Sequence, residues 1–210
     1  MIRHTLLVLA ALGLLAGQAA AQPRPDPDWP CVQRKVPTLS AGTVWTGPDI
    51  EAAGPWGDDF AAAALAQKLA SRRTELADVD GLLDAYLTKL QEDKDPDRAK
   101  HLTHVFAGVF EVINGERDRV MSGIARYARG QRVMAERIRE EADKISQTKD
   151  APSPEDAREL PKEQSEMESK FAWDRRIFQE RSQSLTYVCE VPQLLEQRLG
   201  EIARKIQARI

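Results

Sequence analysis

Residues 97–147, DRAKHLTHVFAGVFEVINGERDRVMSGIARYARGQRVMAERIREEADKISQ, carry apolar side chains at helical spacing over their whole length. Several of these side chains stand 11 positions apart, as Leu102 does from Ile113 and Met134 from Ile145. Eleven residues in three turns correspond to about 3.67 residues per turn, which predicts a nearly straight helix without a tight left-handed supercoil. At 1.5 Å per residue, such a helix is roughly 75 Å long.

The next stretch, TKDAPSPED at residues 148–156, contains two prolines and is typical of a turn. Apolar residues at helical spacing resume after it. We therefore predict that the chain folds back on itself as an antiparallel helical hairpin. Its two arms are expected at about residues 97–147 and 155–189.

The position of the turn also predicts the register of the two arms. A turn centred near Ala151 places residue i opposite residue 302 − i, so Arg139 is expected to meet Glu163. Proline disfavours helix at the residue before it, and it suits the first position of a helix. We therefore expect Val191 and Pro192 to interrupt the return arm, with a last helix beginning at Pro192.

The chain before the hairpin divides into two parts. Residues 22–57 are rich in proline and glycine and predict an extended arm, which is nevertheless too apolar to be a free linker. Asp58 suits a helix N-cap before an alanine-rich helix, and residues 78–91 fit a second short helix. The predicted fold class is all-α: a long, coiled-coil-like antiparallel hairpin, with shorter helices and the Pro-rich arm at its base, and a helical domain over residues 58–210.

Residues 1–21 have the three parts of a secretory signal peptide. Arg3 supplies the positive region, Leu6–Ala16 is apolar, and Ala19 and Ala21 suit a cleavage site. We expect cleavage near Ala21 and a periplasmic or secreted product. No later stretch has the ~18 apolar residues that a transmembrane helix needs, so we expect no transmembrane segment.

The chain contains two cysteines, Cys31 and Cys189. In an exported protein two cysteines usually pair, which predicts a disulfide that fastens the N-terminal arm to the return arm of the hairpin. The predicted register places Cys189 opposite about Ile113. The alternatives are two free thiols or bonds between two chains.

His101 and His104 stand three residues apart and share one face of the predicted helix, with Asp97 one turn earlier. Two imidazoles and a carboxylate are ligands that zinc or copper accepts. The alternative is that both histidines are ordinary polar or interfacial residues. The local sequence matches neither the H-E-x-x-H nor the E-x-x-H metal motif.

Four glycines at spacings of 7, 8 and 7 form a seam along the same helix: Gly108, Gly115, Gly123 and Gly130. Each glycine inside a helix costs about 1 kcal/mol, so the seam calls for a compensating contact. One interpretation is close packing of the arm or of the alanine-rich helix. The other is a groove for a partner, flanked by Arg119 and Arg126 and formed with Gly115, Gly123 and Gly130. The surrounding residues 117–139 hold seven arginines and two acids, which favours salt bridges to the return arm together with solvation; the alternative is an anionic partner or a membrane surface.

Two stretches, DWPCVQRKVPTLSAGTVWTGP at residues 28–48 and YVCEVPQLLEQRLG at residues 187–200, resemble a family of exported helical proteins of proteobacteria. The resemblance covers both cysteine regions. It implies export and a helical fold, and no activity.

The chain contains no nucleophile elbow, P-loop, haem-attachment or dinucleotide-binding motif. Its net charge of −3 argues against nucleic acid as a partner. We therefore predict a periplasmic interaction or scaffold protein, not an enzyme and without a cofactor, that binds another periplasmic protein; the hairpin also offers a surface for pairing two copies. The alternative is a metal-binding accessory protein of a periplasmic redox system.

Overall fold

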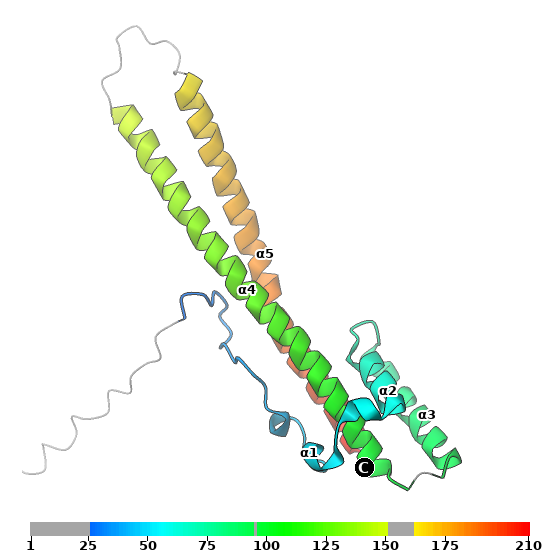
Figure 1. Ribbon diagram of the computed structural model, residues 1–210. Coiled ribbons are helices and arrows are strands. Elements are labelled where there is room, and N and C mark those ends of the chain that lie inside the picture. The colour runs from blue at the N-terminus through cyan, green and yellow to red at the C-terminus, as the bar shows by residue number, and fades with distance from the viewer. Residues whose placement is uncertain (1–25, 95, 151–161) are drawn as a thin grey trace, which may run out of the picture.

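A computed structural model describes residues 26–94, 96–150 and 162–210 (Figure 1). Helices dominate these residues, and no strand occurs among them. In chain order the elements are the 3-10 turn η1 (Ala41–Thr43), α1 (Ile50–Ala53), η2 (Trp56–Asp58), α2 (Phe60–Ala70), η3 (Leu76–Asp78), α3 (Val79–Glu92), α4 (Arg98–Asp150) and α5 (Lys162–Gln207).

Helices α4 and α5 form the predicted long antiparallel hairpin, which confirms the all-α fold class. With 53 residues, α4 is about 80 Å long. The N-terminal arm runs from the middle of the hairpin to its base, where α1, α2 and α3 also lie (Figure 1). The arm is less extended than predicted, because it contains three single helical turns. The predicted signal peptide and the connection between α4 and α5 lie outside the described residues.

The predicted break at Val191 and Pro192 is wrong, since α5 continues through Pro192 to Gln207. A proline inside a helix removes one hydrogen bond and costs about 3 kcal/mol. Here the cost is offset by packing, because Pro192 is itself buried and the following turns bury Leu195 and Leu199 in the core. The expected separate last helix is therefore the end of α5.

The predicted register is also wrong, by about nine residues. Arg137 pairs with Asp174 and Glu141 with Lys170, and each pair of residue numbers sums to 311 rather than 302. The reason is the length of the connection: α4 ends at residue 150 and α5 begins at residue 162, so the midpoint of the hairpin lies near residue 156. The expected contact of Arg139 with Glu163 therefore does not form.

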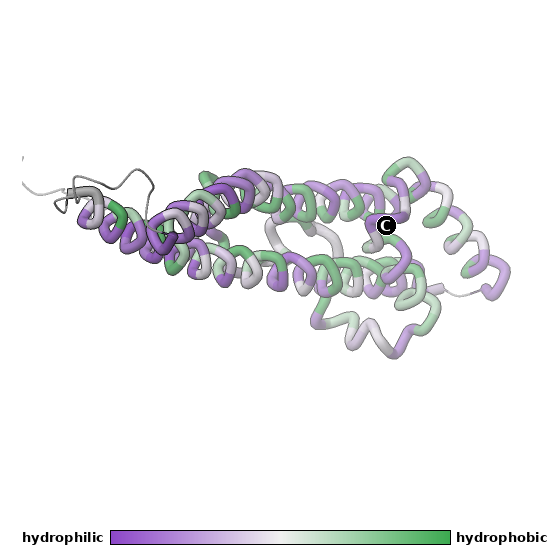
Figure 2. The backbone as a smooth tube through the Cα atoms, turned by 90° about the horizontal axis from the view of Figure 1, so that it is seen from above, coloured by the Kyte–Doolittle hydropathy of each residue, from purple (hydrophilic) through white to green (hydrophobic). Residues whose placement is uncertain are grey.

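The hydrophobic core lies at the base of the hairpin, where α2 and α3 pack on α4 and α5 (Figure 2). The arm contributes Trp45, whose ring stacks on Phe106 with centroids 4.0 Å apart. Arg198 of α5 donates hydrogen bonds to the carbonyl oxygens of Leu69, Ser71 and Thr74, and so binds the carboxyl end of α2. These contacts join every element at the base into one unit.

Farther from the base, the α4–α5 interface becomes more polar. Apolar side chains there are still buried at Ile124, Met134 and Ile145, as the 11-residue spacing predicts. Between them lie buried polar residues, namely Gln131, Glu141, Gln164 and Asp174. The outer half of the hairpin is therefore held by a thin apolar seam together with hydrogen bonds and ion pairs.

Gly108 allows α2 to approach α4 closely. A Cβ atom at Gly108 would lie 2.7 Å from the Cβ of Ala66 and 2.8 Å from Cε3 of Trp56. Both distances are shorter than any ordinary contact, so only glycine fits at this position without displacing α2 or the arm. One of the four seam glycines is thus explained by internal packing.

This contact generates a stability prediction. Gly108→Ala should lower the free energy of unfolding by about 1 to 3 kcal/mol, because the added methyl group overpacks the interface with α2. Gly115→Ala is the matched control: no atom lies within 4 Å of its added Cβ, so it should raise stability by about 1 kcal/mol through helix propensity. Chemical denaturation measures both, and equal effects of the two substitutions would contradict the close approach.

Candidate functional site

The structure joins Cys31 of the arm to Cys189 of α5 by a disulfide, as the sequence predicts. The two Cα atoms are 5.5 Å apart, and 158 residues separate the cysteines in the chain. Because of the shifted register, Cys189 lies level with about residue 122 of α4 and not with Ile113. The arm is therefore fastened near the middle of the hairpin.

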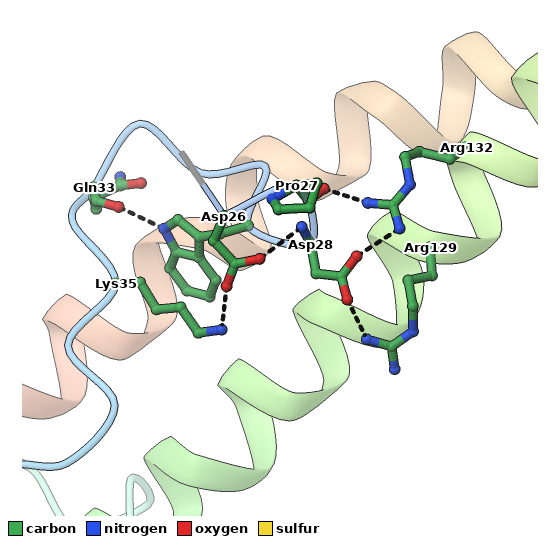
Figure 3. A network of polar contacts seen from close by, with 8 residues as sticks. Asp26, Pro27, Asp28, Gln33, Lys35, Arg129 and Arg132 are labelled. Atoms are coloured by element: carbon green, nitrogen blue, oxygen red, sulfur yellow. Dashed lines mark hydrogen bonds and ion pairs between the residues drawn. The ribbon is translucent and has the colours of Figure 1, made fainter. Parts of the chain in front are cut away.

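Next to the disulfide, Asp28 of the arm binds two arginines of α4 (Figure 3). Its carboxylate accepts hydrogen bonds from Arg129 at 2.9 Å and from Arg132 at 2.5 Å. Arg132 also donates to the carbonyl oxygen of Pro27. The hydrogen bonds from Arg132 and Arg129 hold the pKa of the Asp28 carboxyl below its ordinary value. Sequence reasoning did not identify Asp28 as a partner of the basic run.

Arg117 holds the next part of the arm. Its side chain is 2% exposed, and its Nε donates to Glu196 of α5 at 2.6 Å. Its Nη2 donates to the carbonyl oxygen of Val36 at 2.5 Å. One buried guanidinium thus connects α4, α5 and the arm. Its ion pair with Glu196 means that the charge of Arg117 is not left unpaired in the interface.

The seven arginines of residues 117–139 therefore fall into two groups. Four have acidic partners: Arg117, Arg129, Arg132 and Arg137. The remaining three, Arg119, Arg126 and Arg139, form no ion pair with any residue that the structure describes. The expected salt bridges to the return arm account for Arg117 and Arg137, whereas Arg129 and Arg132 bind the N-terminal arm instead.

Two adjoining hollows lie between α4 and α5, and we call them together the open groove. The larger hollow has a volume of about 480 Å³ and is lined by Gly123, Arg126, Tyr127, Gly130, Gln131 and Arg181. The smaller one measures about 150 Å³ and is lined by Gly123, Ile124, Tyr127, Ser184, Leu185 and Val188. They share Gly123 and Tyr127, so they form one continuous surface.

The open groove and the arm occupy opposite faces of the hairpin. Successive residues of a helix are rotated by about 100°, so Arg129 and Arg132 lie on one side of the buried Ile124 and Gly123 and Gly130 on the other. On α5 the disulfide side is lined by Ser182, Thr186 and Glu190, whereas Ser184 and Val188 line the groove. The arm therefore covers one face of the hairpin and leaves the other uncovered.

The remaining seam glycines belong to this uncovered side. A Cβ atom at Gly115 or Gly130 would have no atom within 4 Å, and one at Gly123 would meet only the Arg126 side chain at 3.9 Å. Internal packing therefore explains Gly108 but not Gly115, Gly123 or Gly130. Arg119 lies on the same side, where its Nε donates to the Gly115 carbonyl at 3.2 Å.

The predicted metal ligands are used in a different contact. Nδ1 of His101 donates to Asp59, Nδ1 of His104 lies 3.5 Å from the same carboxylate, and Nε2 of His104 donates to the Ala53 carbonyl at 2.8 Å. Asp97 lies just before the first residue of α4, where its carbonyl oxygen accepts a hydrogen bond from the His101 N–H at 3.1 Å. Within the described ranges no group of three His, Cys, Asp or Glu side chains has a metal-binding arrangement. Sequence reasoning missed Asp59, which was adjacent to the predicted N-cap.

Asp59 is the N-cap of α2, and its carboxylate also accepts a hydrogen bond from the Ala62 N–H at 2.9 Å. Burial alone would raise the pKa of this carboxyl, but the hydrogen bonds from Ala62 and His101 outweigh burial and hold the pKa below its ordinary value of 3.8. The cluster joins α1 and α2 to the beginning of α4.

Comparison with known protein families, with curated proteins and with solved structures finds no match to this chain. Among the described helices, none has a stretch that is both long and apolar enough to cross a membrane.

The Asp59 cluster predicts a pH-dependent contribution to stability. The folded-state pKa of Asp59 is depressed, so its stabilisation is complete above the unfolded pKa and is lost as the pH falls through the folded pKa. Asp59→Asn keeps the capping oxygen but removes the charge, and it should cost about 1 to 3 kcal/mol at pH 7. Below pH 3.8 the difference in free energy of unfolding between Asp59→Asn and the native chain should shrink. Urea unfolding at both pH values measures this, and a constant difference would contradict the ionised contact.

The disulfide fastens the arm but is not part of the core at the base, so breaking it should loosen the arm while the helices stay folded. Closing a loop of 158 residues stabilises the folded chain by up to roughly 5 kcal/mol in the chain-entropy model. Reduction should therefore lower the melting temperature but leave the far-ultraviolet circular dichroism at 25 °C nearly unchanged, because the base core does not depend on the disulfide. Labelling of both thiols before reduction would contradict the bond, and loss of helix on reduction would contradict the independence of the core.

Proposed function

We propose that this chain is a non-enzymatic interaction protein of the periplasm, which binds another protein on the open groove of its helical hairpin. The observation that carries the proposal is the distribution of charge on α4. Acidic residues of the arm or α5 pair with four of its arginines, namely Arg117, Arg129, Arg132 and Arg137. Arg126, which lines the groove, and Arg119, two turns before it on the same side of α4, form no ion pair with the described residues. Arginine is favoured at protein interfaces because its planar group presents several donors.

The construction of the hairpin supports this function. The arm is held on one face by a disulfide, by Asp28 and by Arg117, so it keeps that face covered and stiffens the helix pair. Rigid elements present a binding surface at a low entropic cost. A scaffold of this kind acts through shape and charge, and it needs no set of reactive side chains.

The disulfide supports the proposed compartment. Disulfides persist in oxidising environments such as the bacterial periplasm and are rare in the cytosol. Together with the signal peptide that the sequence predicts at residues 1–21, this bond supports export of the chain. The partner is then expected among exported proteins or the exported parts of membrane proteins.

Site-specific photo-crosslinking in the periplasm of the source cells tests the proposal. A photoreactive residue at Gly130, in the groove, should give a discrete protein adduct, because a Cβ atom added there has no neighbour within 4 Å in the described part of the chain. The matched control is Gln183, an exposed residue on the outward side of α5. An adduct of the same size at both positions, or none at either, would contradict binding at the groove.

A further inference from the structure

We propose that the occupant of the open groove is an amphipathic helix of the partner, with an apolar stripe flanked by aspartate and glutamate. This inference rests on the proposed function and identifies the class of segment that the groove recognises. Three features carry it: an apolar floor, arginines at both edges without carboxylate partners in the described chain, and a backbone surface suited to a helix.

The floor of the groove is apolar. Ile124 is 1% exposed and lies at the bottom, and Leu185 and Val188 of α5 extend the surface towards solvent, with Val188 41% exposed. A hollow of about 150 Å³ with apolar walls accepts a ring the size of benzene. One large apolar side chain of a partner can therefore enter between α4 and α5 beside Tyr127.

The edges of the groove are cationic. Arg126 stands at the α4 edge, with Arg119 beyond it, and Arg181 stands at the α5 edge. The nearby acid Glu180 is bound by Arg176 at 3.0 Å, and no ion pair of the described residues involves Arg119, Arg126 or Arg181. A ligand with carboxylates on both sides of an apolar stripe would neutralise both edges, whereas a basic ligand would be repelled.

The covered face shows how this hairpin already binds a carboxylate of the arm. There, Asp28 neutralises two arginines that are three residues apart on α4, next to the anchor at Cys31. The arm can lie extended because its prolines lack N–H groups and its carbonyls at Pro27 and Val36 receive arginine donors.

A helix satisfies its own backbone hydrogen bonds and therefore suits the groove better than an extended chain. Gly123 and Gly130 are seven residues apart, which is two helical turns, so both lie on one line along α4. Without Cβ atoms they let the backbone of a crossing helix approach. From Arg119 to Gly130 the groove edge runs about 16 Å, which is three turns of a bound helix.

Binding of model peptides to the oxidised mature chain tests the inference. The probe is a fluorescent helical peptide of about 20 residues with a leucine and phenylalanine stripe flanked by glutamate. Two controls keep the helix: one flanks the same stripe with lysine, and the other scrambles the stripe. Fluorescence anisotropy at low salt should show the glutamate peptide binding at least about tenfold more tightly than either control.

Variants of the chain locate the binding. Arg126→Glu should weaken the glutamate peptide about tenfold and improve the lysine peptide. The matched control is Arg139→Glu, which changes another exposed arginine of α4 without an ion pair in the described chain, but outside the groove; it should leave both affinities unchanged. Gly123→Leu should block binding while the melting temperature stays the same or rises, because it fills the floor without meeting a fixed neighbour.

Three outcomes overturn the inference: equal affinity for the glutamate and lysine peptides, equal effects of Arg126→Glu and Arg139→Glu, or binding to phosphatidylglycerol vesicles with no binding to the peptides. If the Gly130 crosslink forms but the peptides do not bind, the partner site stands and the proposed occupant is wrong. If the crosslink is absent while the peptide binds at the groove, the groove does recognise an acidic amphipathic helix, but the proposed periplasmic partner is wrong.

Discussion

The attachment of the N-terminal arm to one face of the hairpin determines which surface of the two long helices the described chain leaves uncovered. A disulfide at Cys31 and Cys189, two ion pairs from Asp28 and the buried guanidinium of Arg117 fix that attachment. The Asp28 carboxylate pairs with Arg129 and Arg132 on the arm side of α4. The same helix carries arginines on its other side, and there no described segment of the chain covers them. The groove thus lies on the face of the hairpin that the arm does not cover.

The hairpin combines a stable base with a more polar outer half. At the base, α2, α3 and Trp45 complete a continuous apolar core with α4 and α5. Farther out, the two long helices bury Glu141 and Asp174 and hold them with Lys170 and Arg137. Buried ion pairs often contribute less net stability than apolar contacts of similar volume. The groove lies between these regions, near the level of the disulfide, where both helices are supported.

The helices, the hairpin and the disulfide could be predicted from the sequence. Helical periodicity is a local pattern, and a chain with two cysteines has only one possible intramolecular disulfide. The register could not, since it depends on how many residues the turn consumes. The helix through Pro192 was missed because burial of the following leucines outweighs a local preference against helix. The role of Asp59 was missed because its two histidine partners lie more than 40 residues away along the chain. Of the four glycines found by their spacing, Gly123 and Gly130 line the hollow between α4 and α5, whereas Gly108 belongs to the core.

Arginine reactivity tests most directly whether the arm covers one face of α4 while the described chain leaves the opposite face open. The folded, oxidised chain is treated with a phenylglyoxal reagent, and mass spectrometry of its peptides gives a modification rate for each arginine. Arg119 and Arg126 should be modified fast, Arg129 and Arg132 more slowly, and Arg117 most slowly. Modification of Arg126 as slow as that of Arg129 would instead show that the groove face is covered as well.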